Sequence, residues 1–392
     1  MPILFSMVII WLSHFLVDLM IGIWPVFKTF AQMDLALAGL IGGGCAFFGE
    51  GMQVVFGILS DRGWRKFLIL AGLFTTTASA YFAYTDSYVG FFLLCLLTCI
   101  GSGAFHPAAV SFVSDLPSQR KGFLIGLFTS GGSFGMAVGQ LAFTQTHSWF
   151  DGHTAWLALP AIIVIIAACL GNLGKQTTTQ SVAPRHFDLK IFKHFFRHRP
   201  LRMLYFSQVC NATMLWGTLF LLPDLLLSRG YDSWISFGGG HLVCIIGSAT
   251  MMMLAGFLAD SYSHRSVILV SCFCGMIFFY SLILIPALNT IALLVLLFGL
   301  GAAIGAVNPV STSLGTLLAP NHKGLVSAFL MGLVWCVSEG IGQIGGGFLA
   351  TCFTDDGPAK ALAIMGNLFL IGLATAYQLP KAVDESVAFE SV

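Results

Sequence analysis

The chain has 392 residues, of which 57% are hydrophobic and only 9% are charged, and its mean hydropathy is +0.88. Because soluble domains carry about 25% charged residues, this composition excludes a soluble globular protein and indicates a protein that lies in a lipid bilayer. The net charge of +1 gives no reason to expect a nucleic-acid partner.

Twelve apolar runs of about 20 residues, each long enough to cross about 30 Å of hydrocarbon, can be placed along the chain. They predict an all-α membrane protein with both ends on the same side. The N-terminus lacks a basic region and its first apolar run is long enough to span, so we expect no cleavable signal. The expected spans are 3–27, 37–59, 67–84, 89–113, 122–145, 154–173, 201–227, 234–259, 266–285, 289–317, 324–353 and 359–379.

The distribution of Lys and Arg predicts the orientation, because short cytoplasmic loops carry the excess of these residues. Of the 18 Lys and Arg, only Lys28, Arg229 and Lys360 lie at the predicted outer ends of spans, and the other 15 lie on the side of the termini. We therefore expect both termini in the cytoplasm. The short loops favour a multi-pass protein of a bacterial inner membrane.

A repeat at an offset of 202 residues indicates an internal duplication. Gly103-Ala104-Phe105-His106-Pro107 recurs as Gly305-Ala306-Val307-Asn308-Pro309, and Lys121-Gly122 recurs as Lys323-Gly324. Between the two copies lies the only long polar stretch, which we interpret as a solvated linker that lies on an anionic lipid surface. The predicted domains are an N-terminal six-helix bundle, a cytoplasmic linker, a C-terminal six-helix bundle and a cytoplasmic tail, at 1–173, 174–200, 201–380 and 381–392.

The cysteines and motifs favour no enzyme and no metal site. All ten Cys lie in predicted spans, and no spacing suggests a disulfide framework or a zinc site. An intramembrane enzyme would need a motif such as H-E-x-x-H or G-x-S-x-G, and the sequence has neither. We therefore expect no enzymatic activity and no cofactor.

Ionisable residues inside the spans are the best functional candidates, because each costs several kcal/mol at the bilayer centre, about 3 on insertion scales, unless it faces a partner or water. His14 and Asp18 lie four residues apart and therefore on one face of the first span. Glu50 and Glu339 lie midway along the second and eleventh spans, and His106 lies in the inner half of the fourth.

Two basic loops of similar pattern join neighbouring spans: residues 57–66 read GILSDRGWRK, and residues 256–265 read GFLADSYSHR in the second half. They resemble the motif G-x-L-a-D-R-x-G-R-R of the major facilitator superfamily. The first copy has Trp64 where the pattern expects glycine, and the second lacks the Arg after Asp260. The resemblance implies a twelve-helix secondary transporter of two pseudo-symmetric bundles that works by alternating access, driven by a proton gradient and functional as a monomer.

The resemblance also implies gating contacts at the cytoplasmic helix ends, where a carboxylate accepts hydrogen bonds from Arg side chains and free helix amides. The alternative is that these loops only anchor the topology. Glycine runs at 42–44, 131–132, 238–240 and 345–347 fall in the helices that form the interface in this family. The predicted gating residues are Asp61, Arg62, Arg65, Arg120, Asp260 and Arg265.

In the facilitator fold the first, fourth, seventh and tenth helices line the central cavity. This implies a cavity with a titratable pair, Asp18 and His106, at which protons and substrate compete. The alternatives are a structural bond from Asp18 to His14, and a His106 that only satisfies carbonyls freed by Pro107. The predicted substrate-cavity residues are Asp18, His106, Asp224, Asn308, Gln140 and Trp24.

For proton coupling we predict Asp18, His14, His106, Glu50 and Glu339. The two glutamates either share a proton across the interface or are structural groups shielded from lipid. Because the second copy of the repeat has Asn308 in place of His106, we expect the coupling chemistry in the N-terminal half and substrate recognition mainly in the C-terminal half.

A narrower resemblance concerns the fosmidomycin-resistance branch of the superfamily, whose members are associated with drug efflux. It rests on residues 14–18, 101–107 and 131–135, which read HFLVD, GSGAFHP and GGSFG. The antiporter pattern G-x8-G-x3-G-P is partly kept, with Gln140 in place of the proline. We expect export of a small amphipathic molecule in exchange for protons, with proton symport of a polar nutrient as the alternative.

Overall fold

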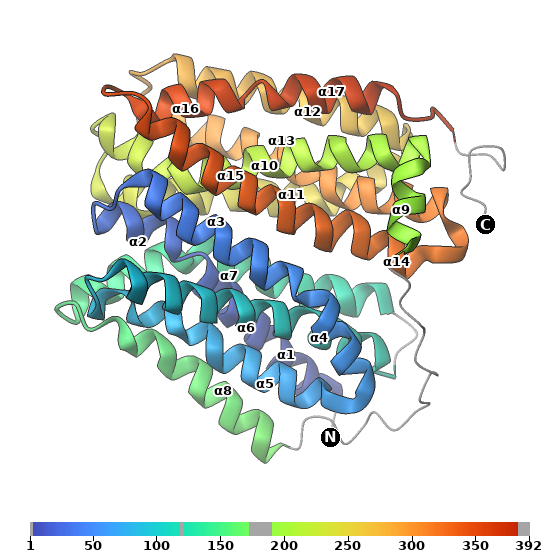
Figure 1. The fold of residues 1–392 in the computed structure, drawn as a ribbon, viewed down its shortest axis with the longest axis horizontal. Helices are drawn as coiled ribbons and strands as arrows, with labels where there is room; N and C mark the ends of the chain where they lie inside the picture. Colours follow the sequence, from blue (N-terminus) through green and yellow to red (C-terminus); the bar gives the residue numbers. More distant parts are fainter. Residues whose placement is uncertain (1–2, 118–120, 172–189, 383–392) are drawn as a thin grey trace. The chain divides into compact units, whose positions relative to one another are not determined.

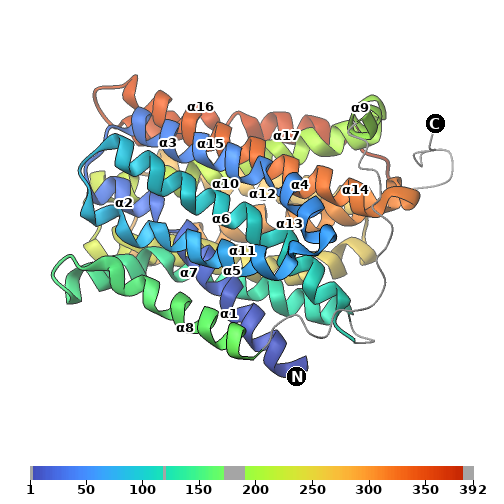
Figure 2. The same cartoon turned by 60° about the horizontal axis from the view of Figure 1, so that its bottom comes forward.

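The computed structural model describes residues 3–117, 121–171 and 190–382, and every regular element in these ranges is a helix (Figures 1 and 2). The first part contains α1 (Ile3–Ile21), α2 (Trp24–Phe30), α3 (Leu35–Gly51), α4 (Gln53–Leu59), the π-helical turn η1 (Ser60–Trp64), α5 (Arg65–Thr76), the 3₁₀ segment η2 (Thr77–Tyr84), α6 (Tyr88–Asp115), α7 (Lys121–Trp149), the 3₁₀ segment η3 (Thr154–Ala158) and α8 (Leu159–Leu170). This confirms the expectation of an all-α protein.

The second part continues with the same kind of elements. It contains α9 (Lys190–Arg197), α10 (Arg199–Ser228), η4 (Ile235–Gly239), α11 (Gly240–Ser261), α12 (His264–Leu284), α13 (Thr290–Leu318), η5 (Pro320–His322), α14 (Lys323–Ser327), η6 (Ala328–Leu333), α15 (Val334–Thr351), α16 (Gly357–Met365) and α17 (Leu368–Tyr377).

Within the described ranges, ten helical stretches are long and apolar enough to cross a membrane. One of them, Leu35–Tyr84, covers the second and third predicted spans, and a shorter apolar stretch, Thr154–Leu170, lies at the sixth. The count of twelve crossings therefore stays a prediction.

The chain bends between the second and third predicted spans at η1. Gly63 has φ +95° there, a conformation that costs other residues 1–2 kcal/mol. The pattern of the loop expects a glycine at position 64, where this chain has Trp64. The glycine that makes the turn is therefore one residue earlier.

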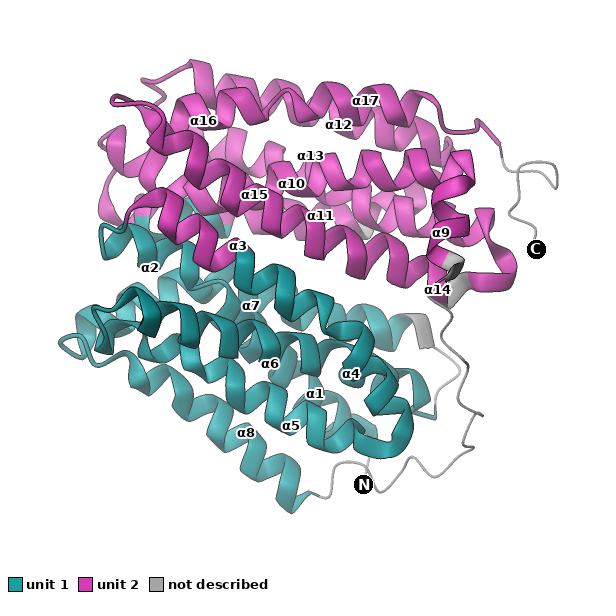
Figure 3. Cartoon of the chain, viewed as in Figure 1, with its two compact units in different colours: residues 1–33, 44–186, 237–242 teal, residues 34–43, 187–236, 243–392 magenta. Residues whose placement is uncertain are grey.

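The chain forms two compact units (Figure 3). Unit 1 contains residues 1–33, 44–186 and 237–242, and unit 2 contains residues 34–43, 187–236 and 243–392. Each unit therefore takes one short segment from the other half of the sequence.

Glycines explain why the first of these short segments belongs to unit 2. A Cβ at Gly43 would lie 2.8 Å from the carbonyl oxygen of Gly340, and one at Gly39 would overlap the backbone of Gln343. Only glycines allow this approach of α3 to α15. In lipid, where no hydrophobic force draws helices together, such close backbone packing holds them.

Within unit 1, α1 packs along α7, and α5 runs beside α6 in both views (Figures 1 and 2). A buried cluster that includes Val17, Phe105 and Phe128 joins α1, α6 and α7. Because this cluster fixes how α6 and α7 face α1, it also fixes the polar side chains that these helices carry.

Within unit 2, α10 packs against α15 and α17, and α12 packs along α13. The short helix α9 covers one end of this bundle: Phe195 is fully buried and lies 5.6 Å from Phe329 between ring centroids, whereas Lys193 and Arg197 are exposed. The expectation of a wholly solvated linker at 174–200 is therefore wrong for 190–197, because the phenylalanines of α9 pack. The linker residues 174–189 lie outside the described ranges.

Candidate functional site

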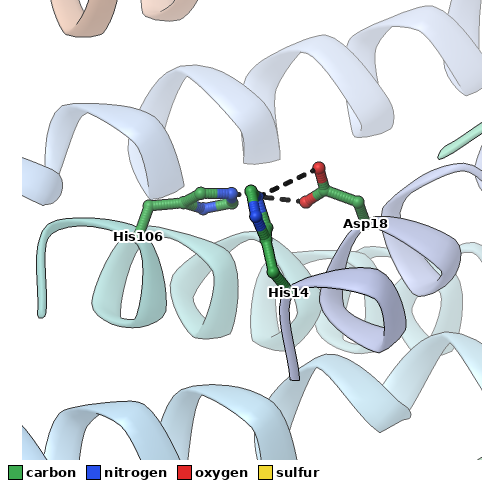
Figure 4. A group of neighbouring side chains, drawn as sticks. All are labelled: His14, Asp18 and His106. Atoms are coloured by element: carbon green, nitrogen blue, oxygen red, sulfur yellow. Dashed lines mark ion pairs between the residues drawn. The ribbon is translucent and has the colours of Figure 1, made fainter. Parts of the chain in front are cut away.

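Three ionisable side chains from α1 and α6 converge in unit 1 (Figure 4). The Nε2 atom of His14 lies 3.5 Å from Asp18 Oδ2, and the Nε2 atom of His106 lies 3.3 Å from Asp18 Oδ1. The side chains of His14, Asp18 and His106 are 6%, 15% and 20% exposed. The predicted neighbours on α1 thus lie together, and His106 joins them from a helix 92 positions away in sequence.

Hydrogen bonds to backbone carbonyls orient both imidazole rings. His14 Nδ1 lies 2.8 Å from the carbonyl oxygen of Phe128, and His106 Nδ1 lies 3.0 Å from that of Ser102. A carbonyl oxygen only accepts hydrogen bonds, so a hydrogen on each Nδ1 is the assignment that satisfies both contacts. A neutral ring of this tautomer presents a bare Nε2 to Asp18. Each contact with the carboxylate then becomes attractive only when a further proton lies on Asp18 or on the ring.

The ligand atoms of the three residues all lie within 4.8 Å of one another. Among the His, Cys, Asp and Glu residues that the structure describes, this is the group of three that could hold a metal ion. One small cation can therefore contact all three. A proton is the smallest, and it needs only one oxygen and one nitrogen at a time.

The wall of this cluster on the α7 side is formed by a ring and a glycine. The ring of Phe128 stacks on that of His14 with centroids 4.1 Å apart. A Cβ at Gly132 would overlap with Asp18 Oδ2 and His14 Nε2. The glycine of the predicted 131–132 pair therefore leaves room for the polar cluster itself.

A second carboxylate lies next to the cluster. The Ser102 hydroxyl lies 3.1 Å from His106 Nδ1 and donates to Glu50 Oε1 over 3.1 Å. The Gln53 amide donates to the other oxygen, Oε2. Glu50 is 9% exposed and Ser102 is 1% exposed. Glu50 was among the predicted coupling residues, whereas neither Ser102 nor Gln53 was a predicted site residue.

Pro107 in α6 bears on the alternative role of His106. Pro107 lies inside this helix and lacks the N–H that would bond the carbonyl of Gly103. The His106 ring bonds the carbonyl of Ser102, one residue before the freed one. Its contacts with a carbonyl and with a carboxylate are compatible, since one uses Nδ1 and the other uses Nε2.

Other predicted cavity and coupling residues belong to unit 2. Glu339 Oε1 accepts a hydrogen bond from Gln343 over 3.0 Å, and Asn308 Oδ1 accepts one from Gln208 over 2.8 Å, both in unit 2. Asp224 is partly buried near the end of α10. The role of these residues stays a prediction.

Trp24 and Gln140 are in unit 1 but do not contact Asp18 in the described hydrogen bonds or ring contacts. Trp24 is 5% exposed and packs on Phe82. Gln140 is fully buried, and its Nε2 lies 2.9 Å from His241 Nδ1. The role of Trp24 and Gln140 in substrate binding stays a prediction.

The predicted gating residues have different surroundings. Asp61, Arg62 and Asp260 are exposed, and the guanidinium of Arg265 lies 4.7 Å from the ring centroid of Tyr377. Arg120 lies outside the described residues. The gating role stays a prediction for all of them.

Arg65, another predicted gating residue, pairs with Asp115, which was not among the predicted site residues. Its Nη1 donates to Asp115 Oδ2 over 2.8 Å and its Nη2 donates to Ser111 Oγ over 2.7 Å, which ties the start of α5 to the end of α6.

Because Asp115 is 49% exposed, we expect Asp115→Asn to lower the free energy of unfolding by no more than about 1 kcal/mol. Chemical denaturation of the purified protein measures this change, and a loss several times larger would contradict a solvent-screened pair.

The chain is similar to several membrane transporters. It is 31% identical over 137 residues to an uncharacterized transporter of Methanocaldococcus jannaschii and 26% identical over 161 residues to the Fosmidomycin resistance protein of Escherichia coli K12. These matches cover 33% and 40% of this chain but only 36% and 40% of those two proteins. It is also 27% identical over 384 residues to the inner membrane transport protein YajR of Escherichia coli K12, across 92% of this chain and 81% of that protein.

Solved structures show the same fold. A bacterial homolog of the human lysosomal transporter Spinster, in an inward-facing and occupied conformation, superposes with a TM-score of 0.78 at 14% identity, over 95% of both chains. In sequence, the family model of the Major Facilitator Superfamily matches residues 3–343 of this chain. This match confirms the resemblance seen in the loops, and it implies a transporter rather than an enzyme: the chain belongs to the major facilitator superfamily of secondary transporters.

Proposed function

We propose that this transporter couples the movement of its substrate to protons bound by Asp18, His14 and His106. The observation that carries the proposal is the convergence of two imidazole Nε2 atoms on one partly buried carboxylate, at 3.3 and 3.5 Å. With both Nδ1 hydrogens directed at carbonyls, the cluster is repulsive when empty of added protons and attractive when it holds one. A site of this kind binds and releases protons as its surroundings change.

Glu50 and Glu339 are further candidates for coupling, with different support. Glu50 reaches His106 through Ser102, which favours a role together with Asp18. Glu339 is buried and bonds Gln343 in unit 2. We propose that coupling is concentrated in unit 1.

For the substrate we propose a small amphipathic molecule that is exported in exchange for protons. The similarity to the Fosmidomycin resistance protein and the spacing of Gly126, Gly135 and Gly139 support export. Gln140 in place of the antiporter proline favours the alternative, proton symport of a polar nutrient. The predicted span centres contain no Lys or Arg, so neutral, zwitterionic or cationic solutes fit more easily than a strong anion.

Direction can be tested with purified protein in liposomes that are loaded with fosmidomycin, and separately with a set of cationic dyes, drugs, sugars and amino acids. With an alkaline interior and an acidic exterior, an exporter of the proposed kind releases its substrate, because protons enter as substrate leaves. Accumulation of the same compound under this gradient would favour symport. A gradient of reversed sign on the same liposomes is the control for leakage.

We also propose a functional monomer in a bacterial inner membrane, with both termini in the cytoplasm. The 15 to 3 distribution of Lys and Arg supports this orientation, and YajR is by its name an inner membrane protein. Cysteine labelling from one side of intact cells tests the orientation, with Lys381→Cys and Lys360→Cys each made in a background in which the exposed Cys169 and Cys352 are replaced by Ser. Of the two engineered cysteines, only the one at position 360 should react with an impermeant reagent from outside.

A further inference from the structure

We propose that Ser102 and His106 form a proton relay that joins Asp18 to Glu50, so that a proton bound at Asp18 is passed to Glu50 within unit 1. This inference rests on the proposed coupling role of Asp18 and adds the path by which the proton leaves it. In this relay Ser102 positions His106 and passes the proton on, and Glu50 receives it.

The relay is a continuous chain of contacts across three helices. Asp18 Oδ1 on α1 lies 3.3 Å from His106 Nε2 on α6, His106 Nδ1 lies 3.1 Å from Ser102 Oγ, and this hydroxyl lies 3.1 Å from Glu50 Oε1 on α3. Each distance is short enough for a hydrogen bond or for one after a small movement. Because Ser102 and His106 lie four residues apart on α6, one helix face holds both middle members.

The chain of contacts permits two directions of donation. In the first, Asp18 carries the proton and donates to His106 Nε2, His106 Nδ1–H is shared between the Ser102 carbonyl oxygen at 3.0 Å and Ser102 Oγ at 3.1 Å, and the Ser102 hydroxyl donates to ionised Glu50. In the second, Asp18 is ionised and accepts from Nε2–H, His106 Nδ1 gives up its bond to the Ser102 carbonyl and accepts from the Ser102 hydroxyl, and protonated Glu50 donates to Ser102 Oγ.

Conversion of the first arrangement into the second moves three protons by one step each. The Asp18 proton goes to Nε2, the Nδ1 proton goes to Ser102 Oγ, and the Ser102 proton goes to Glu50 Oε1. One net positive charge moves from Asp18 to Glu50, and His106 ends neutral with its other tautomer. No oxidant, metal or second reactant is needed.

Of the two carboxylate oxygens of Glu50, Oε1 is the one that can accept the relayed proton. The Gln53 amide already donates to Oε2, and an amide N–H cannot pass on a proton as a hydroxyl does. The titratable groups that face Glu50 in unit 1 are His106 and Asp18, and those that face Asp18 are His14 and His106. Helix α7 also packs against the cluster, through the carbonyl oxygen of Phe128 and through Gly132. Neither group titrates.

The experiment follows the two carboxyl groups directly, in purified full-length protein in lipid, by infrared difference spectroscopy during pH titration. The C=O bands of protonated Asp18 and Glu50 are assigned with Asp18→Asn and Glu50→Gln. If the relay exists, Asp18→Asn shifts the titration midpoint of the Glu50 band. The same substitution made in a Ser102→Ala background shifts it by a clearly smaller amount.

Matched variants separate the relay from packing. Ser102→Thr keeps the hydroxyl and is expected to keep the linkage. Ser79→Ala removes another hydroxyl that is 1% exposed, one that contacts Thr98 and not the cluster, and is also expected to keep it. In liposomes, Ser102→Ala is expected to slow proton-driven transport by about 10²-fold, the low end of what a positioned proton-transfer group contributes, whereas Ser102→Thr and Ser79→Ala are not.

An equal shift of the Glu50 band with and without the Ser102 hydroxyl would overturn the relay, as would a normal transport rate in Ser102→Ala. If Ser102→Ala is not recovered as folded protein, Ser102→Cys, whose thiol is close to the hydroxyl in size but only a weak donor, is measured in the same way with the same outcomes. A failure of Asp18→Asn to change transport would overturn the proposed coupling function instead. The infrared linkage still decides the relay in that case, because it needs no substrate.

Discussion

Replacement of Asp18 by Asn is expected to abolish proton-driven transport while leaving the protein folded. The amide has the size of the carboxyl group, and its N–H can donate to one of the two bare Nε2 atoms at 3.3 and 3.5 Å, as a protonated carboxyl does. It cannot release a proton. We therefore expect the loss of net transport driven by a pH gradient, by about 10²-fold or more.

The same variant should also distinguish export from symport. In an antiporter where protons and substrate compete for one site, the amide mimics the proton-loaded form, so exchange of labelled for unlabelled substrate is lost as well, whereas a symporter held in that form still exchanges. Asp355→Asn serves as the control, because this carboxylate is 82% exposed and pairs with Lys360 at the surface. Asp18→Asn with unchanged pH dependence of transport would contradict the assignment.

The all-helical character of the fold was accessible from the sequence, because hydropathy predicts long apolar helices directly. The topology read from the Lys and Arg distribution and the duplication read from the repeat at Gly103 and Gly305 stay predictions. The turn at Gly63 and the packing of Phe195 were not accessible. A one-residue shift of a glycine and the burial of a short amphipathic helix depend on tertiary contacts that periodicity does not report.

The site was accessible only in part, for a similar reason. His14 and Asp18 were predicted neighbours because helical geometry relates residues four apart, and His106 was placed beside them by the family resemblance. Ser102 was missed because a serine in an apolar span usually bonds its own helix backbone, and nothing in its local sequence distinguishes a hydroxyl that reaches a carboxylate on another helix. Gln53 lies three residues after Glu50, so this spacing was a signal that could have found it.

The glycines of the antiporter-like pattern on α7 are expected to differ sharply in their tolerance of alanine. A Cβ at Gly135 would overlap the carbonyl oxygen of Phe15 and lie 3.0 Å from the amide nitrogen of Leu19, whereas a Cβ at Gly126 would meet nothing within 4 Å. Neither neighbour of Gly135 can rotate away, because both are backbone atoms of α1. Gly135→Ala must therefore separate α1 from α7, and we expect it to lower the free energy of unfolding by about 3 kcal/mol or more.

Gly126→Ala provides the matched control, since it lies on the same helix and makes the same chemical change. Here the added methyl group meets open space, and alanine favours the helix by up to about 1 kcal/mol over glycine, so the free energy of unfolding should stay equal or rise. Unfolding of the purified variants in detergent, followed by circular dichroism, measures both. Equal losses for the two variants would contradict the packing argument. Opposite signs would mean that two glycines of one pattern act differently, with Gly135 holding α1, and therefore Asp18, against α7, and Gly126 free of that constraint.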